Sequence, residues 1–169
     1  MKKKAGILLI LFFSLFHTGC RVSYSFSGAD VPPEAMHFSV ETFKIQATLA
    51  PPDIGQVFTE ALKDLILAQT RLDVVPEGGH LRYQGAITGY QIAPTAITAS
   101  ESAALNRLTM TVSVKYINTF DKEKNFEGTF SRFADYESNQ DLTAVERGLI
   151  DEINEQITQD IFDKSLGAW

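Results

Sequence analysis

The chain has 169 residues, of which 44% are hydrophobic and 21% charged, and its formal net charge is −6 at pH 7. This length and composition favour one ordinary globular domain, and the acidic balance argues against a nucleic-acid partner. The chain has a single cysteine, Cys20, which excludes a disulfide within the chain.

The first residues have the pattern of an export signal. Three lysines follow Met1, and residues 5–16 are apolar except for Gly6 and Ser14. A helix rises 1.5 Å per residue, so twelve residues cannot cross a bilayer core of about 30 Å. We therefore expect residues 1–19 to be a signal peptide rather than a permanent transmembrane helix.

Cys20 ends the sequence His17-Thr18-Gly19-Cys20, directly after the apolar run. It is either a chance cysteine beside an ordinary cleavage site or the lipidated residue of a lipobox. We favour the lipobox, because an unpaired thiol in an oxidising compartment invites unwanted pairing. Gly19 fits a lipobox, whereas His17 stands where an aliphatic residue is usual. Cleavage before Cys20 would remove three lysines and leave 12 basic against 21 acidic side chains, so membrane attachment would come from lipid.

The segment after Cys20 is predicted to be a tether. Residues 20–34 are rich in Ser, Gly and Asp and contain the pair Pro32-Pro33, which disfavours a helix. An acidic run directly after the cysteine is absent from the sequence, so we expect the following domain, residues 35–169, to face the periplasm.

The first half of the predicted domain alternates strands with one helix. Residues 35–43 have the period-two pattern of a strand, which places Met36, Phe38 and Val40 on one side. From Ile54 the period changes to that of a helix of about four turns, with Asp53 as N-cap or first-turn acid. Short and longer strands follow at residues 71–75 and 81–92, and the glycines of the second indicate a bulge or a close backbone approach.

The second half predicts a hairpin and a long helix. In the strand predicted at residues 107–120, positions 108–116 alternate strictly between apolar and Thr, Ser or Lys side chains, so one face is buried and the other polar. Residues 126–136 return as the second strand. The last helix begins near Asp141 or Thr143, where Thr143 and Glu146 have capping-box spacing, and carries an apolar stripe to Ile161 and Phe162.

These elements predict an α+β fold. Each helix has one apolar stripe and the sheet has one apolar face. All three apolar surfaces are buried when both helices pack on the same face of the sheet. We expect a two-layer sandwich whose four- to five-stranded sheet is mostly antiparallel, with a right-handed crossover at the first strand-helix-strand unit.

The sequence offers little for catalysis or metal binding. The mature chain would have only His37 and His80 as histidines, and no HExxH, GxSxG, Walker or GxGxxG motif occurs. The acidic residues of the last helix are better explained as a solvated face. Asp135 and Glu137 allow a Ca²⁺ site in principle, and a polar strand edge is the simpler interpretation. We therefore predict neither enzyme, nor cofactor, nor metal site.

Two surfaces are left as candidates for binding. Residues 94–106 form a long connection of small residues, which is either a mobile loop or a loop that orders against a partner. The polar face of the strand at residues 107–120 is the second. Arg107, Lys115 and Arg132 would give it a local positive charge, as a partner or anion surface or as ordinary solvent-face charges.

Several segments together resemble the LptE family of lipopolysaccharide-assembly lipoproteins, in its shorter branch. They run in order through nearly all of the mature chain, and it is their order and spacing rather than one motif that carries the resemblance. The segments are YSFSGADVPPE (24–34), FTEALKDLILAQTRLDVV (58–75), GAITGYQIAPTAI (85–97), NRLTMTVSVKYIN (106–118), FEGTFSRFADY (126–136) and LIDEINEQITQDIF (149–162).

The resemblance implies a lipid-anchored outer-membrane protein that binds inside a large LptD-like β-barrel and helps it to insert lipopolysaccharide. It implies no catalytic residues, and it carries over only one site residue, the lipidated Cys20. A second hypothesis is a periplasmic lipoprotein that binds a small ligand or scaffolds another envelope complex.

Overall fold

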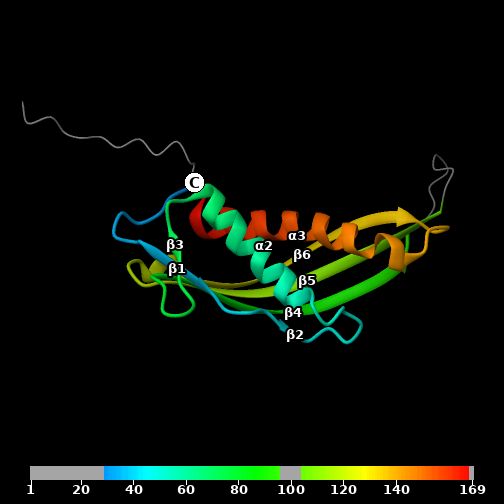
Figure 1. Cartoon of the computed structure of the whole chain (residues 1–169), viewed down its shortest axis with the longest axis horizontal. Coiled ribbons are helices and arrows are strands. Elements are labelled where there is room, and N and C mark those ends of the chain that lie inside the picture. Colours follow the sequence, from blue (N-terminus) through cyan, green and yellow to red (C-terminus); the bar gives the residue numbers. More distant parts are fainter. Residues whose placement is uncertain (1–28, 96–103, 168–169) are drawn as a thin grey trace, which may run out of the picture.

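The computed structural model describes residues 29–95 and 104–167. The predicted signal peptide, Cys20 and part of the connection at residues 94–106 lie outside these ranges. Within them, the chain forms one sheet and two long helices (Figure 1). In chain order the elements are β1 (His37–Val40), β2 (Lys44–Ile45), α2 (Ile54–Gln69), β3 (Asp73–Val74), β4 (Leu81–Pro94), β5 (Leu105–Asn118), the 3-10 helix η2 (Lys122–Lys124), β6 (Phe126–Glu137) and α3 (Leu142–Leu166).

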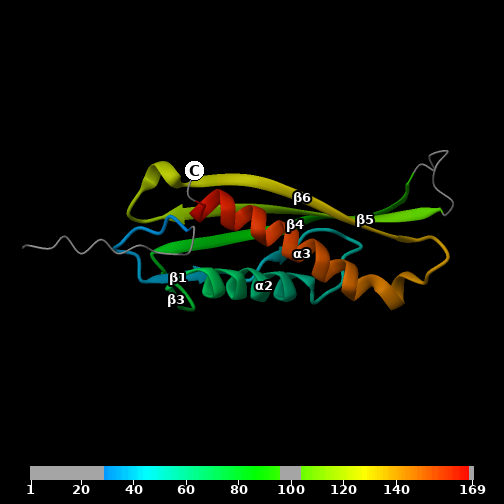
Figure 2. The same cartoon turned by 90° about the horizontal axis from the view of Figure 1, so that it is seen from above.

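The sheet has six strands in the order β3-β1-β4-β5-β6, and β2 pairs with β4 beyond the end of β1. Strands β4, β5 and β6 form an antiparallel meander, while β1 is parallel to both β3 and β4. Both helices lie side by side on the same face of the sheet (Figures 1 and 2). The predicted α+β two-layer fold is confirmed, and the sheet exceeds the expected four to five strands because a short additional strand, β2, follows the predicted first strand.

Helix α2 forms where the sequence predicts it. Its apolar stripe includes Phe58, Leu62 and Ile66, which are fully buried against the sheet. Asp53 is the N-cap residue, but its side chain makes no capping hydrogen bond. Its carboxylate instead accepts a hydrogen bond from Arg147 of α3 at 2.9 Å, so it links the two helices.

Helix α3 begins at Leu142, with Asp141 as its N-cap. The Asp141 carboxylate accepts a hydrogen bond from the backbone N–H of Thr143 at 3.1 Å. Thr143 lies inside the first turn, so the capping box expected between Thr143 and Glu146 does not form. Glu146 instead accepts a hydrogen bond from the Tyr90 hydroxyl at 2.6 Å. This bond ties the first turns of α3 to β4. Within the described residues, no helix is long and apolar enough to cross a membrane.

The core lies between the helices and one face of the sheet. The alternation predicted for β5 is confirmed, because its even-numbered side chains from Leu108 to Tyr116 are all fully buried. Met36 was expected to share the inner side of the first strand, but it precedes β1 and is 64% exposed. The first strand therefore contributes only Phe38 and Val40 to this core, and Phe43 joins them from the segment after it.

Phe43 explains why β1 and β2 are separate strands. Its ring is buried and packs edge-on against Phe58, with 4.8 Å between centroids. Gly85 makes room for the Phe43 ring, and Gly55 makes room for the Phe43 backbone. A Cβ on Gly85 would lie 2.6 Å from a Phe43 ring carbon and 2.1 Å from the Ser113 carbonyl oxygen, and a Cβ on Gly55 would lie 2.3 Å from the Phe43 carbonyl oxygen. The chain thus leaves the sheet to bury one aromatic ring, and then rejoins β4 as β2.

Candidate functional site

The face of the sheet that the helices leave uncovered is the candidate functional site, and we call it the open face. The register between β4, β5 and β6 defines it: the odd-numbered residues of β5 stand beside their paired neighbours on the two flanking strands. Hydroxyl side chains dominate its centre, where Thr111 and Ser131 share a hydrogen bond of 3.0 Å. Its central polar residues are Gln84, Gln91, Thr109, Thr111, Ser113, Lys115, Glu127, Thr129 and Ser131.

Arg107 lies at one end of the open face, and its charge is paired. Its guanidinium donates two hydrogen bonds to the Asp135 carboxylate, at 2.7 and 2.8 Å, and stacks 3.5 Å from the centre of the Phe133 ring. The hydrogen bonds from Arg107 lower the pKa of Asp135, and the same contact raises the pKa of Arg107. This end is therefore an apolar ring beside a neutralised pair rather than a free positive charge.

Arg132 does not belong to the open face. It pairs with Met110, whose side chain is buried under the helices, so Arg132 points to the same side. There it donates two hydrogen bonds of 2.7 Å to Asp160 of α3. The grouping of Arg107, Lys115 and Arg132 on one surface is therefore wrong, because side chains alternate along β6 and Arg132 lies on the other side.

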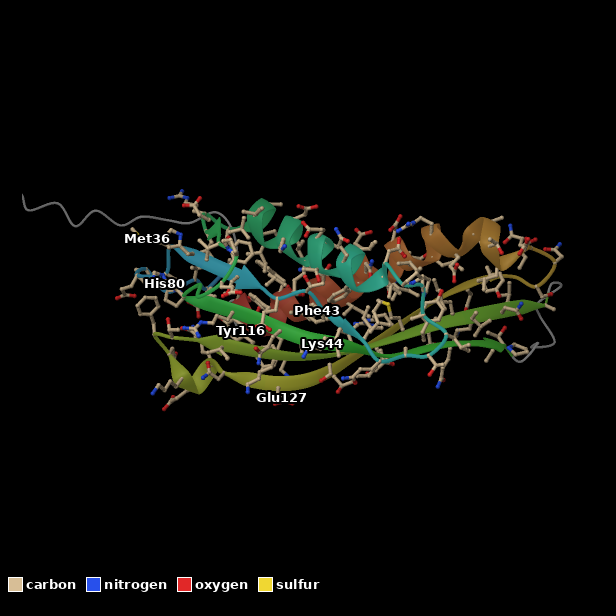
Figure 3. The ribbon with its side chains drawn as sticks, turned by 60° about the horizontal axis from the view of Figure 1, so that its bottom comes forward. Met36, Phe43, Lys44, His80, Tyr116 and Glu127 are labelled. Carbon is tan, nitrogen blue, oxygen red and sulfur yellow. The ribbon has the colours of Figure 1, made fainter. Side chains whose placement is uncertain are left out.

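Lys115 is exposed on the open face and contributes to a shallow hollow of about 360 Å³. Lys44 enters the hollow from β2, and the carboxylates of Glu41 and Glu127 flank it. Figure 3 shows Lys44 toward the β2 edge and Glu127 toward the β6 edge of this part of the sheet. Gln84 and Ser113 are among the uncharged polar residues that line it.

The hollow exists because the chain leaves the sheet at Phe43. Between β1 and β2 the backbone departs from β4 and returns, so Gln84 and Gly85 have no paired neighbour on this side. Two amines and two carboxylates with hydroxyl and amide groups between them suit a polar ligand that both donates and accepts hydrogen bonds. The sequence analysis did not find Lys44 or Glu41, because only the long-range pairing of β2 with β4 brings them beside Lys115.

The buried phenols do not offer acid or base chemistry. Burial raises the pKa of Tyr83 and of Tyr116, and burial together with the hydrogen bond to Glu146 raises the pKa of Tyr90. The Tyr83 hydroxyl shares a hydrogen bond of 2.9 Å with Ser165 of α3. All three hydroxyls stay protonated at physiological pH, and those of Tyr83 and Tyr90 tie β4 to α3.

His37 and His80, the two histidines of the described residues, lie together at one end of the sheet. Their ring centres are 5.6 Å apart, and His80 accepts a hydrogen bond from the Met36 backbone N–H at 3.1 Å. Figure 3 places Met36 and His80 side by side at this end. Residues 29–95 and 104–167 contain no group of three or more His, Cys, Asp or Glu side chains that could hold a metal ion.

The chain enters the domain beside the end of α3. Ala29 forms a β-bridge with Gly167, and Asp30 forms an ion pair of 2.5 Å with Lys124 of η2. At the opposite end of the sheet, β4 and β5 remain paired as far as Pro94 and Asn106. The described residues of the predicted connection 94–106 therefore belong mostly to the hairpin. Residues 96–103 lie outside the described ranges, and the two interpretations of that connection stay open.

Comparison with known proteins identifies one family. Residues 35–165, well over half of the chain, match the model of a family described as LptE, lipopolysaccharide-assembly. No curated protein sequence matches the chain.

Solved structures share the fold at low sequence identity. A putative neuraminyllactose-binding hemagglutinin homolog from Helicobacter pylori is 12% identical, with 84% of this chain and 89% of that chain covered and a TM-score of 0.51. The hypothetical protein CT253 from Chlamydia trachomatis is 8% identical, with 78% and 98% covered and a TM-score of 0.51. A minor lipoprotein from Acinetobacter baumannii is 17% identical, with 79% and 97% covered and a TM-score of 0.46.

Proposed function

The chain belongs to the LptE family of lipopolysaccharide-assembly proteins, and on that premise we propose that it is an outer-membrane lipoprotein that binds inside an LptD-like β-barrel. In this role it assists the barrel in placing lipopolysaccharide at the outer membrane, and it works by binding rather than by catalysis. The observation that carries the proposal is the family match, which spans the domain from before β1 to the last turn of α3.

The open face supports a fit against a barrel wall. The lumen of an outer-membrane barrel is polar, and the open face presents hydroxyls, amides and charges that are paired or balanced. Arg107 is bound by Asp135, and Lys115 stands opposite Glu127 in the register. A surface of this kind can be covered by polar protein at little electrostatic cost, because few isolated charges would be desolvated.

We propose that the same face contributes the glycolipid contact. Lipopolysaccharide is anionic and rich in hydroxyl groups, and the hollow holds the amines of Lys44 and Lys115 beside hydroxyl and amide side chains. Lys115, which the sequence predicts, and Lys44 are therefore the candidate residues for this contact. Arg132 is not, because it lies on the helix side of the sheet.

The proposed anchor is a lipid on Cys20. Each buried acyl CH₂ contributes about 0.8 kcal/mol, so two or three chains hold a protein firmly to a membrane. Eight residues lie between Cys20 and Ala29, which gives a reach of roughly 30 Å at most when fully extended. The domain would therefore hang in the periplasm with its α3 C-terminal end nearest the membrane.

The hollow also supports a second candidate, a periplasmic lipoprotein that binds a small polar ligand or scaffolds another envelope complex. Its volume, about 360 Å³, is at the lower end of the range for small-molecule sites. This candidate needs no barrel and no lipopolysaccharide.

Purification from gently solubilised membranes separates the two candidates. The proposal expects the chain to elute with a large barrel whose migration changes on heating. Lys115→Glu should weaken that association or lower lipopolysaccharide binding, whereas Lys63→Glu, on α2 outside the open face, is the matched control. Elution of the chain alone, with no lipopolysaccharide bound, would support the small-ligand candidate. Mass spectrometry of the same sample tests lipidation of Cys20 independently.

A further inference from the structure

A groove opens between α2 and α3, on the side of the molecule opposite to the open face. Figure 2 shows the two helices side by side over the sheet, and the groove between them has a volume of about 400 Å³. Helix α2 contributes the apolar side chains of its floor, which are Val57, Ala61, Leu65 and Ala68. Two alanines among these four keep the groove open, because larger side chains at the same positions would fill it.

The rim of the groove is acidic. Asp64 of α2 and Asp151 and Glu155 of α3 line it and are exposed. Among the described residues none of the three is in an ion pair; the ion pairs of α3 engage Arg147 and Asp160 instead. An apolar floor between unpaired carboxylates is complementary to a ligand that has an apolar stripe and positive flanks.

Asn154 gives an independent indication that the groove receives a ligand. Its side chain lines the groove and is only 2% exposed. Neither its amide nitrogen nor its carbonyl oxygen has a hydrogen-bond partner in the described part of the chain. Buried polar groups are almost always hydrogen-bonded, so an amide that lacks both partners calls for an explanation. A polar group brought into the groove by a ligand supplies one.

The charge of the rim selects among possible occupants. A second copy of this chain would oppose carboxylates with carboxylates, and an anionic lipid surface would be repelled by them. A bound cation alone would leave the apolar floor uncovered. A polypeptide segment with apolar side chains three and four residues apart, flanked by Lys or Arg, satisfies the floor, the rim and Asn154 together.

We propose that the α2–α3 groove binds a cationic amphipathic helical segment of a partner protein. The apolar side of the segment lies on Ala61, Leu65 and Ala68, its basic residues face Asp64, Asp151 and Glu155, and a polar side chain pairs with Asn154. This inference does not depend on the barrel or on lipopolysaccharide, because the groove lies on the helix side and the proposed barrel and lipopolysaccharide contacts lie on the open face.

Binding of a defined peptide to the full chain in nanodiscs of zwitterionic lipid tests the proposal. The probe is a labelled amphipathic helix of Leu, Ala and Lys, and the comparison peptide has Glu at every Lys position. Fluorescence anisotropy should show at least tenfold tighter binding of the Lys peptide, with empty nanodiscs as the blank. Binding should weaken as the salt concentration rises, because exposed charges are screened.

Two sets of charge variants separate the rim from the net charge. Asp64→Asn, Asp151→Asn and Glu155→Gln together should weaken binding by about tenfold, since three exposed pairs of modest strength are lost. The matched set Glu34→Gln, Glu77→Gln and Glu152→Gln removes the same charge from outside the groove and should change binding by less than about twofold on the same reasoning.

A steric variant tests the floor. Ala68→Trp, at an exposed position, should occlude the groove and abolish binding, while thermal unfolding verifies that the domain still folds. Equal affinity for the Lys and Glu peptides would overturn the proposal. Equal losses in the two charge sets, or undiminished binding by folded Ala68→Trp, would also overturn it, and none of these results would affect the proposed membership of a barrel complex.

Discussion

The two faces of the sheet are built on opposite principles. On the helix side, the even-numbered residues of β5 from Leu108 to Tyr116 are fully buried against α2 and α3, and three exposed carboxylates line the groove between the helices. On the open face, the odd-numbered residues from Arg107 to Lys115 are polar, and the guanidinium of Arg107 is bound by a neighbouring carboxylate. One strand therefore supplies both the stability of the domain and a surface that is free for recognition.

This difference teaches where substitutions are tolerated. Burying a Leu, Ile or Phe side chain contributes about 1.5–3 kcal/mol, and the helix side collects nearly all such positions. Surface substitutions away from special features usually change stability by less than about 0.5 kcal/mol. The open face can therefore be adapted to a partner at little cost to folding, and four predictions test this contrast from the largest effect to the smallest.

The largest effect is expected on the helix side. Ile157 of α3 is fully buried in the core, and Ile157→Ala should lower the free energy of unfolding by about 2–5 kcal/mol, because it leaves a cavity. Urea unfolding followed by circular dichroism measures this loss. A loss below about 1 kcal/mol would mean that α3 contributes little to the core and would break the contrast.

A gain in stability is expected at Asn154, the groove residue whose buried amide has no hydrogen-bond partner among the described residues. Asn154→Leu replaces an unpartnered buried amide with an apolar side chain of similar size. The free energy of unfolding should rise by about 1–2 kcal/mol, because the desolvation cost of the amide disappears. The same urea experiment detects the gain, and Thr158→Leu is unsuitable as a control because the Thr158 hydroxyl donates a hydrogen bond to Glu155. Destabilisation by Asn154→Leu would show that the amide has a favourable role in the free protein.

The Arg107–Asp135 pair should give a smaller effect with a defined pH dependence. A double-mutant cycle with Arg107→Ala and Asp135→Ala should give a small favourable coupling at neutral pH, because both side chains are exposed to solvent. Because the pKa of Asp135 is lowered in the folded chain, the coupling is present above the unfolded pKa of about 3.9 and is lost as the pH falls through the lowered folded value. A coupling that persists after Asp135 is protonated would show that it does not depend on the charge of the Asp135 carboxylate.

The smallest effect is expected in the middle of the open face. Thr129→Val preserves the β-branched shape and removes an exposed hydroxyl of β6. The free energy of unfolding should change by less than about 0.5 kcal/mol. A change above 1 kcal/mol in the urea experiment would show that this face contributes to stability as the helix side does.

The sequence predicted the elements whose pattern is local. The strict alternation of β5 and the apolar stripes of α2 and α3 fix both the element type and the buried side. The bulge expected at the glycines of β4 also occurs, as a register shift between Ile87 and Gly89. The sequence pattern does not predict the separation of β1 from β2, because it depends on the room that Gly85 gives the Phe43 ring and Gly55 gives the Phe43 backbone from elsewhere in the chain.

The candidate site was predictable only in part. The sequence could have shown which face of the sheet Arg132 points to. Arg132 is an even-numbered residue of β6, like Phe126, Phe130 and Tyr136, which lie on the helix side. The hollow and the groove were not, because each is assembled from elements far apart in the chain. Lys44 meets Lys115 only through the pairing of β2 with β4, and Asn154 meets Ala61 only through the packing of α3 beside α2.

Depletion of the chain in living cells, followed by measurement of lipopolysaccharide at the cell surface, tests the central claim most directly. The account predicts that surface lipopolysaccharide falls as the chain is depleted and recovers when the chain is supplied again. Complete depletion with unchanged surface lipopolysaccharide would contradict it.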